Sequence, residues 1–227
     1  MKNLKNLIKK LTEFDTPTIC NGMELVDSKY KLNHFTKKSF FCLYPKLKPM
    51  VGFAKTAKIK SLKDNNSKPS DIRIPYYEYV NNSNFPKISV IEDLISNPIG
   101  SFWGEVNANI HYKLGCLGVL TNGSVRDLDV IPKKFQLLSG TLSPSHAEVH
   151  LVEFSKKIKI HGMSVNDNDL IHADQHGAIN IPVDKLKELI LAIKHISKKE
   201  KIILDSCQSK DFKFMNFKKA YLKAQKL

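Results

Sequence analysis

The chain has 227 residues and is 42% hydrophobic, which supplies enough apolar material for a core and excludes a disordered chain. Its longest apolar runs, such as 189–193, fall well short of the ~20 residues that a membrane-spanning helix needs. The formal net charge of +14 indicates an anionic partner, yet only Arg73 and Arg126 among the 36 basic residues are arginine. Because nucleic-acid surfaces favour the planar fork of arginine, the composition favours a small anionic substrate over nucleic acid.

The N-terminus and the cysteines predict a cytoplasmic protein. The first ten residues alternate lysine with leucine and asparagine, and they lack the apolar core of a secretory signal. The four cysteines are far apart and form no CxxC pair, a pattern typical of reduced thiols rather than of disulfides or a zinc site. They are Cys20, Cys42, Cys116 and Cys207.

The first half of the chain predicts helices and strands in alternation. Helical segments are expected at 3–11, 16–26 and 76–80, and strands at 51–60 and 88–91. Thr16 is expected to cap the second helix, with Pro17 in its first turn. The polar, turn-rich residues 61–75 predict a loop.

The second half predicts a helix from Gly104 to Leu114 that ends at Gly115, with short strands around it and two helices at the end. The strands are expected at 99–103, 117–121, 135–138, 150–154, 158–165, 170–172 and 178–181, and the last helices at 183–208 and 211–225. This order predicts a mixed α/β fold, with one domain spanning 1–227 and a helical extension from about 183.

A first candidate site is the helix start at Gly104, Glu105, Val106 and Asn107. Unpaired backbone N–H groups and the positive end of the helix dipole favour a carboxylate or phosphate there, and glycine allows a ligand to approach closely. The alternative is that this helix start, like most, binds only water.

A second candidate site is the pair Arg126 and Asp127, which follows a predicted buried strand and an Asn-Gly turn. Ligands tend to gather at strand ends in α/β sheets. The arginine offers a fork for a carboxylate or oxo group, and the aspartate offers a hard oxygen for a divalent cation. The alternative is a surface ion pair, which would contribute ~0–1 kcal/mol to stability.

Other polar residues are weaker candidates. His146 and His150 have the spacing of helical zinc ligands, but Pro144 and the strand-like residues that follow argue against a helix. Four further residues are predicted to form turns between strands: Asp169, His172, Asp174 and His176. Phosphate-binding loops of the GxxxxGK type, GxSxG and GxGxxG motifs do not occur.

These motifs together resemble the signature of the RraA-like family, which includes the 4-hydroxy-4-methyl-2-oxoglutarate aldolases and the regulator of ribonuclease activity A. The likeness runs in order from about residue 14 to 182. It rests on Trp103-Gly104-Glu105, Gly115, Gly118, Asn122-Gly123 and Val125-Arg126-Asp127, and on residues 16–21, 52–56, 162–165, 169–170, 173–174, 176–178 and 181–182. The resemblance implies a swivelling ββα fold, a homotrimer or a hexamer of paired trimers, and Mg²⁺ or Mn²⁺ as cofactor.

The resemblance also implies roles for the two candidate sites. Asp127 is expected to be the metal ligand, with waters in most other positions, and Arg126 to bind the oxo and carboxylate oxygens of a short α-keto acid. The backbone from Gly104 to Asn107 is expected to hold the substrate carboxylate, with Glu105 acting through a water on the metal. The family's frequent Pro-Gly-Asp is Asn166-Asp167-Asn168-Asp169 here, which puts the geometry of that turn in doubt.

The activity implied is retro-aldol cleavage or oxaloacetate decarboxylation, in which the metal and Arg126 withdraw electrons from the keto acid and pyruvate is released. Glu200 is a candidate for an acid that the C-terminal region lends to a neighbouring subunit. The alternative is a non-catalytic regulator that binds an endoribonuclease, as one branch of the family does. The retention of Arg126 and Asp127 favours the enzyme.

Overall fold

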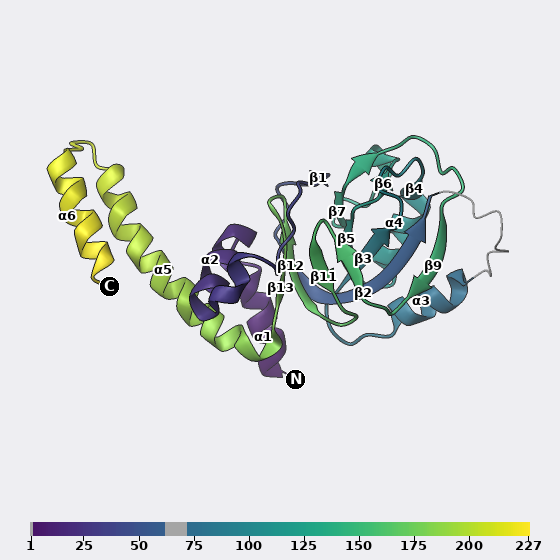
Figure 1. Cartoon of the computed structure of the whole chain (residues 1–227), viewed down its shortest axis with the longest axis horizontal. Helices are drawn as coiled ribbons and strands as arrows, with labels where there is room; N and C mark the ends of the chain where they lie inside the picture. The colour runs from purple at the N-terminus through teal and green to yellow at the C-terminus, as the bar shows by residue number, and fades with distance from the viewer. Residues whose placement is uncertain (1, 62–71) are drawn as a thin grey trace.

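Figure 1 shows a computed structural model of the chain, which describes residues 2–61 and 72–227. A curled sheet lies at one end of the molecule and two long helices extend from the other. The α-helices are α1 (Lys2–Leu11), α2 (Thr16–Val26), α3 (Arg73–Asn81), α4 (Glu105–Lys113), α5 (Leu186–Cys207) and α6 (Phe214–Gln225). Short 3-10 helices are η1 (Ser28–Lys31), η2 (Leu128–Val130) and η3 (Val183–Lys185).

The strands form three sheets. They are β1 (Phe41–Cys42), β2 (Met50–Lys60), β3 (Lys87–Asp93), β4 (Ser101–Trp103), β5 (Cys116–Thr121), β6 (Ser124–Val125), β7 (Gln136–Ser139), β8 (Thr141–Leu142), β9 (His150–Phe154), β10 (Ile158–Ile160), β11 (Met163–Val165), β12 (Leu170–Asp174) and β13 (Gly177–Ile181). The main sheet has the order β1-β7-β5-β3-β2-β12-β13, with β9 also paired to β2. Strands β4, β6 and β8 form a second sheet, and β10 and β11 form a hairpin.

The long strand β2 gives the main sheet its curl. One edge of β2 pairs in parallel with β3, and β5 and β7 continue the parallel order. The other edge pairs antiparallel with β12 over residues 50–53 and with β9 over residues 57–60. Because β2 changes partner along its length, the sheet closes partly around its own interior, which holds buried side chains (Figure 1).

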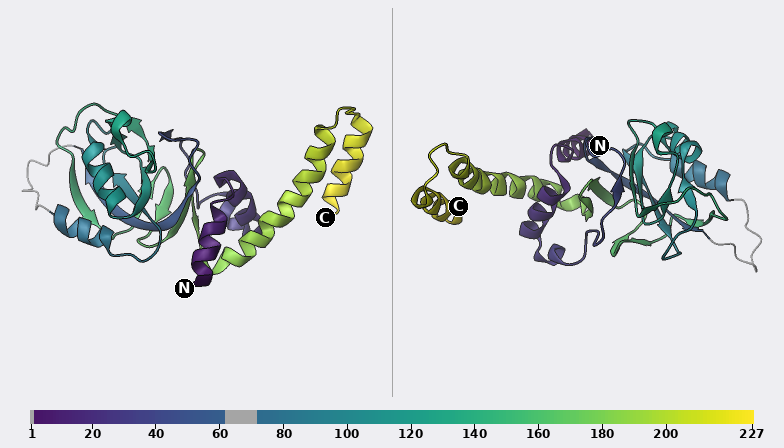
Figure 2. Two further views of the ribbon diagram at one scale, coloured as in Figure 1. Left: turned by 180° about the vertical axis from the view of Figure 1, so that it is seen from behind. Right: turned by 90° about the horizontal axis from the view of Figure 1, so that it is seen from above.

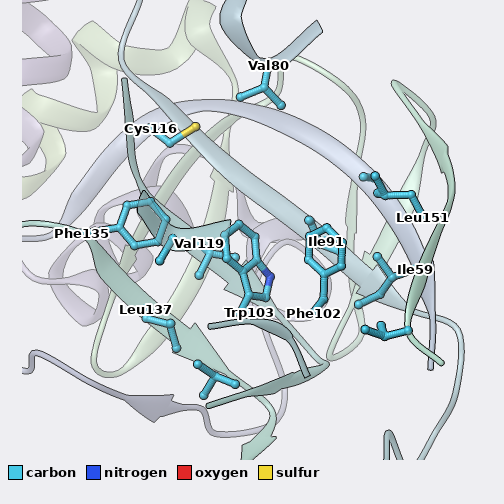
Figure 3. Packing of buried hydrophobic residues seen from close by; sticks show 14 of the residues in the cluster. Ile59, Val80, Ile91, Phe102, Trp103, Cys116, Val119, Phe135, Leu137 and Leu151 are labelled. Atoms are coloured by element: carbon cyan, nitrogen blue, oxygen red, sulfur yellow. The ribbon is translucent and has the colours of Figure 1, made fainter. Parts of the chain in front are cut away.

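Trp103 lies at the centre of the core beneath the second sheet. Its indole is fully buried, and its ring centroid lies 4.6 Å from that of His111 on α4 and 6.0 Å from that of Phe135. Figure 3 shows this side chain surrounded by apolar residues from the main sheet and from β4. Complete burial of such a large side chain fixes β4 and the start of α4 relative to the main sheet.

The N- and C-terminal helices pack on the part of the sheet formed by β12 and β13. In α5 the buried residues all lie in the first turns, and they contact the cluster that contains residues of α1 and α2. Beyond Ile193, α5 extends away from the body of the molecule, and α6 folds back to pack against α5 (Figure 2). We call residues 194–227 the arm. No helix in residues 2–61 and 72–227 has the length and apolar character needed to cross a bilayer.

Four local expectations differ from the structure. Asp15, not Thr16, caps α2, because the Asp15 carboxylate accepts a hydrogen bond from Thr18 N at 2.9 Å. The strand expected at 158–165 is the β10–β11 hairpin, since His161 and Gly162 both have positive φ and form a tight turn. The loop expected at 61–75 ends early because α3 begins at Arg73, and its residues 62–71 lie outside the described part of the chain.

The fourth difference concerns His172, which was expected in a turn and is a fully buried residue of β12. Its Nδ1 lies 3.0 Å from Thr16 Oγ1, and its Nε2 lies 3.1 Å from the carbonyl oxygen of Phe14. Burial lowers the pKa of His172 below its ordinary value. Asp174, the last residue of the same strand, accepts a hydrogen bond from Thr16 N at 2.8 Å and so helps to anchor the start of α2.

Candidate active-site cleft

The two candidate segments meet because β4 and β6 pair in parallel. The carboxyl ends of parallel neighbours lie at the same edge of a sheet, so the residues that follow them are brought together. Gly104 and α4 follow β4, and Arg126 and Asp127 follow β6. The Arg126 N–H donates to the carbonyl oxygen of Trp103 at 2.9 Å and extends this pairing by one residue. The sequence placed the pair beyond the strand at 117–121 and an Asn-Gly turn; the structure adds the two-residue strand β6 between that turn and Arg126.

Asp127 is held directly against the start of α4. Its backbone has φ 58°, in the left-handed region that aspartate tolerates better than most residues. The carboxylate oxygen Oδ2 accepts a hydrogen bond from the Glu105 N–H at 3.1 Å. A carboxylate at this position also interacts favourably with the positive end of the α4 dipole.

Gly104 makes this contact possible. A Cβ atom at position 104 would lie 2.5 Å from Asp127 Oδ2 and 3.2 Å from both Cγ and Nε of Arg126. The first of these distances is shorter than van der Waals contact allows, so any side chain here would displace the Asp127 carboxylate. The glycine is required for close approach and not for its φ, which is −161° and extended.

Arg126 presents an N–H group that the protein leaves unsatisfied. Its Nε lies 3.5 Å from Asp127 Oδ2, which is close enough for an ion pair. The geometry is too poor for a hydrogen bond, and within the described residues this buried N–H has no acceptor. Buried N–H groups are usually paired. The Arg126 side chain as a whole is 36% exposed and lines the cleft, so a ligand can reach the guanidinium beside this buried atom.

The first turn of α4 offers two further donors. The first hydrogen bond of the helix runs from Ala108 N to the carbonyl oxygen of Gly104 at 3.0 Å. The Asp127 carboxylate accepts a hydrogen bond from the N–H of Glu105, whereas the N–H groups of Val106 and Asn107 have no acceptor in the described part of the chain. The Asn107 side chain instead supports the turn, because its Nδ2 donates to the carbonyl oxygen of Phe102 at 2.6 Å.

These groups line one cleft of about 240 Å³. All six residues expected from the sequence line it: Gly104, Glu105, Val106, Asn107, Arg126 and Asp127. Four further lining residues were not predicted: Arg73, Tyr77, Phe102 and His146. The sequence suggested His146 only as a zinc ligand together with His150; His146 lies in a loop, whereas His150 lies in β9.

Glu200 lies exposed on α5 and does not line the cleft, so its role toward a neighbouring subunit stays a prediction.

Among the four lining residues that were not predicted, Arg73 is the one that a signal in the sequence could have identified. The chain contains two arginines among 36 basic residues, and both line this cleft. The scarcity of arginine that drew attention to Arg126 applies equally to Arg73. Its position in a stretch predicted to be a loop hid the connection, because only the folded chain brings α3 beside α4.

A buried, uncharged hydrogen-bond chain supports the cleft from behind. His111 on α4 donates from Nδ1 to the carbonyl oxygen of Asn107 at 2.7 Å, and its Nε2 accepts from the Tyr76 hydroxyl at 2.9 Å. The Tyr76 hydroxyl in turn lies 3.1 Å from Ser89 Oγ on β3. Burial lowers the pKa of His111 to about 4, so this imidazole is neutral at physiological pH. This series of hydrogen bonds fixes α3 and α4 to β3 without placing a charge under the cleft.

The cleft suits a divalent cation bound through Asp127. Within the described residues, Oδ1 of this carboxylate has no hydrogen-bond partner, and the side chain is 38% exposed. No group of three or more histidine, cysteine, aspartate or glutamate side chains gathers in residues 2–61 and 72–227. Asp127 would therefore hold a cation with water as the other ligands, which is coordination that Mg²⁺ accepts.

The fold and the cleft define a mixed α/β protein with C-terminal helices, in which an arginine, an aspartate and a helix start converge on one cleft. The model of the RraA-like family, described as Aldolase/RraA, matches residues 16–180. The chain belongs to the RraA-like family. No curated protein matches its sequence.

Solved structures with the same fold include an uncharacterized protein from Pseudomonas syringae pv. tomato, with 16% identity, a TM-score of 0.73, and coverage of 96% of this chain and 93% of that one. A second is described as one of the novel cellulases from microbes associated with the gut ecosystem, with 18% identity, a TM-score of 0.71, and coverage of 87% and 86%. A third is an unusual member of the RNase ES inhibitor RraA protein family from Streptomyces coelicolor, with 16% identity, a TM-score of 0.69, and coverage of 86% and 95%. At these identities the likeness establishes the fold alone, and it confirms the expected fold class.

Proposed function

We propose that this chain is a divalent-metal-dependent carbon–carbon lyase that releases pyruvate from a short α-keto acid. Retro-aldol cleavage of 4-hydroxy-4-methyl-2-oxoglutarate and decarboxylation of oxaloacetate are the two reactions to test. The observation that carries the proposal is the convergence of Arg126, Asp127 and the N-terminus of α4 on one cleft. The family description, which joins aldolases and RraA proteins, supports it.

The chain's own groups account for binding and for stabilising the developing charge. Val106 and Asn107 line the cleft at a helix start, and we assign their N–H groups to the substrate carboxylate. The Arg126 guanidinium binds the neighbouring oxo oxygen, and its attraction increases as negative charge grows there during carbon–carbon cleavage. Glu105 is the second carboxyl group of the cleft wall, and we assign it the proton transfer. Its carboxylate takes the proton of the C4 hydroxyl in the retro-aldol reaction, or a proton from water in the decarboxylation, and gives it to the pyruvate carbon. A divalent cation, Mg²⁺ or Mn²⁺, would be held by Asp127 and would supply Lewis-acid polarisation of the oxo group.

The test is the replacement Asp127→Asn. Asparagine tolerates the left-handed backbone at this position and keeps an acceptor for the Glu105 N–H, so the fold is retained while the charge that holds the cation is lost. Pyruvate release from either substrate with Mg²⁺, coupled to a dehydrogenase, should fall by roughly 100-fold or more.

The matched control is Asp129→Asn, which removes the same charge two residues away on η2, from an exposed side chain outside the cleft. It should keep full activity. If wild-type protein releases pyruvate no faster than Asp127→Asn from every keto acid tried, the proposed function is wrong.

The second candidate function is a non-catalytic regulator that binds an endoribonuclease. The similarity to a structure described as a member of an RNase inhibitor family favours it. A pull-down that captures the nuclease, together with an absence of keto-acid turnover, would place this function first. The lyase is preferred because a regulator has no need of a partly exposed arginine and a partly exposed aspartate in one cleft.

A further inference from the structure

We propose that Arg73 recognises a second carboxylate at the far end of the substrate, so that the cleft selects dicarboxylic α-keto acids over monocarboxylic ones. The inference rests on the proposed function, because it assigns a role within the same cleft. It begins from the distribution of arginine. Lysine supplies every other basic residue of the chain, yet the two arginines both line this one cleft.

The two arginines come from different walls of the cleft. Arg126 follows β6 and lies against Asp127, beside the start of α4. Arg73 is the first residue of α3, a separate helix. In the proposed function, the substrate carboxylate binds at the α4 N-terminus and the oxo group binds Arg126. The other end of such a substrate would then extend toward Arg73.

The contact between α3 and α4 fixes where Arg73 lies. The Tyr77 hydroxyl donates to Oδ1 of Asn107 at 2.9 Å, so Tyr77 is fastened to the first turn of α4. Residues four apart share one face of a helix, with Cβ atoms ~5–6 Å apart. Arg73 is therefore on the same face of α3 as Tyr77, one turn farther from the donors that we assign to the first carboxylate. This offset suits two carboxylates that are joined by a short carbon chain.

The charges of the cleft fit the same substrate. Arg73 and Arg126 are balanced by Glu105 and Asp127 among the lining residues. When a divalent cation is held at Asp127, a dianion restores neutrality, whereas a monoanion leaves a net positive charge. Arginine is also the side chain whose fork binds a carboxylate with two parallel hydrogen bonds, which lysine cannot do.

Two ligands that differ only at the far end provide the experiment. 2-Oxoglutarate carries a distal carboxylate, and 2-oxopentanoate has the same carbon chain without it. Neither contains the bond that the proposed reaction breaks. Titration calorimetry in the presence of Mg²⁺ should show the wild-type protein binding 2-oxoglutarate about tenfold or more tightly than 2-oxopentanoate. Arg73→Gln should remove this preference and leave the affinity for 2-oxopentanoate unchanged.

Lys113→Gln is the matched control, because it removes one positive charge from an exposed residue at the other end of α4, outside the cleft. It should preserve the preference. Retention of the preference in Arg73→Gln, or equal binding of the two acids by wild type, would overturn the assignment of Arg73. Arg73 is exposed, so its replacement should leave the chain folded, which circular dichroism checks.

The result is separable from the test of the proposed function. If Arg73→Gln loses the preference but no keto acid is turned over, the role of Arg73 stands and the lyase does not. If pyruvate is released but wild type binds both acids equally, the lyase stands and the role of Arg73 is wrong. If neither acid binds, Arg73 is not a carboxylate receptor.

Discussion

At the scale of single residues, the cleft depends on a missing side chain. Gly104 lets the Asp127 carboxylate reach the Glu105 N–H, and it places Arg126 beside the same carboxylate. The sequence showed a glycine before a helix and an Arg-Asp pair 22 positions later. It gave no measure of the space between them, because that space depends on the pairing of two strands.

Gly104→Ala should therefore reduce activity strongly while leaving the chain folded. The new Cβ would lie 2.5 Å from Asp127 Oδ2, and the carboxylate, as the end of a side chain, moves to relieve the clash. The extended φ at position 104 is open to alanine, so the backbone is not strained. We expect roughly a 100-fold loss of pyruvate release and a change in melting temperature of only a few degrees.

Gly123→Ala serves as the comparison, because the nearest atom to its added Cβ is Thr121 Oγ1 at 3.2 Å and neither Arg126 nor Asp127 lies near it. Full activity in Gly104→Ala would contradict the geometry described for the cleft.

At the scale of secondary-structure elements, His111 connects α4 to α3 and, through Tyr76, to β3. The sequence marked this histidine as nothing more than one residue of a helix. His111 is important because it is buried. The helical periodicity did not reveal this burial, because the side chain that covers His111 is Trp103, which comes from β4.

The buried His111 should make stability depend on pH. Burial lowers its pKa from 6.5 to about 4 in the folded chain, so between these values the unfolded chain binds a proton that the folded chain does not. Stability therefore falls as pH falls through this window, by about 2 kcal/mol between pH 7 and pH 5 for this residue. Urea unfolding at the two pH values measures the loss.

The replacement His111→Gln should reduce the difference between the two pH values, even though it also lowers stability at pH 7 by disturbing the buried hydrogen bonds. His150→Gln, at a histidine nearer the surface, should leave the difference unchanged. An unaltered pH dependence in His111→Gln would show that other groups are responsible.

At the scale of the whole molecule, the exposed apolar surface of the arm has no explanation within a single chain. Six large apolar side chains of the arm are at least 50% exposed: Leu204, Phe212, Phe214, Met215, Leu222 and Leu227. Exposed apolar surface of this extent marks an interaction site. We propose that the arm packs against another copy of the chain in a trimer or hexamer.

Ending the chain after Gln208 removes α6 and should lower the mass of the assembly measured by light scattering after size exclusion. The body should keep its melting temperature, because the buried residues of α5 all lie in its first turns. Phe214→Ser should weaken the assembly in the same direction, and Lys213→Ser at the neighbouring exposed position should not. An unchanged mass in the truncated chain would rule out this role for α6.

The sequence by itself determined the local features of this protein. Sequence patterns located α1, α2, α4, α5, α6 and most strands, and Gly115, with φ 88°, ends α4 as expected. The motif residues at Gly104 and Arg126-Asp127 were identified because their chemistry is local: a helix start, a fork and a carboxylate. The turn at 166–169, which was in doubt, is closed by Asp169, whose carboxylate accepts from Asn166 N at 2.8 Å, with Asn168 in the left-handed region.

Only the tertiary structure decided which of these features share a site. The parallel pairing of β4 with β6 brought the two motifs together, and the Tyr77–Asn107 contact brought Arg73 to the same cleft from a helix that the sequence showed as a loop and a single turn. Strand pairing and helix packing join residues far apart in the chain, and their energies come from contacts that no local pattern records. The local sequence therefore specifies the chemical groups, and the long-range contacts specify where they meet.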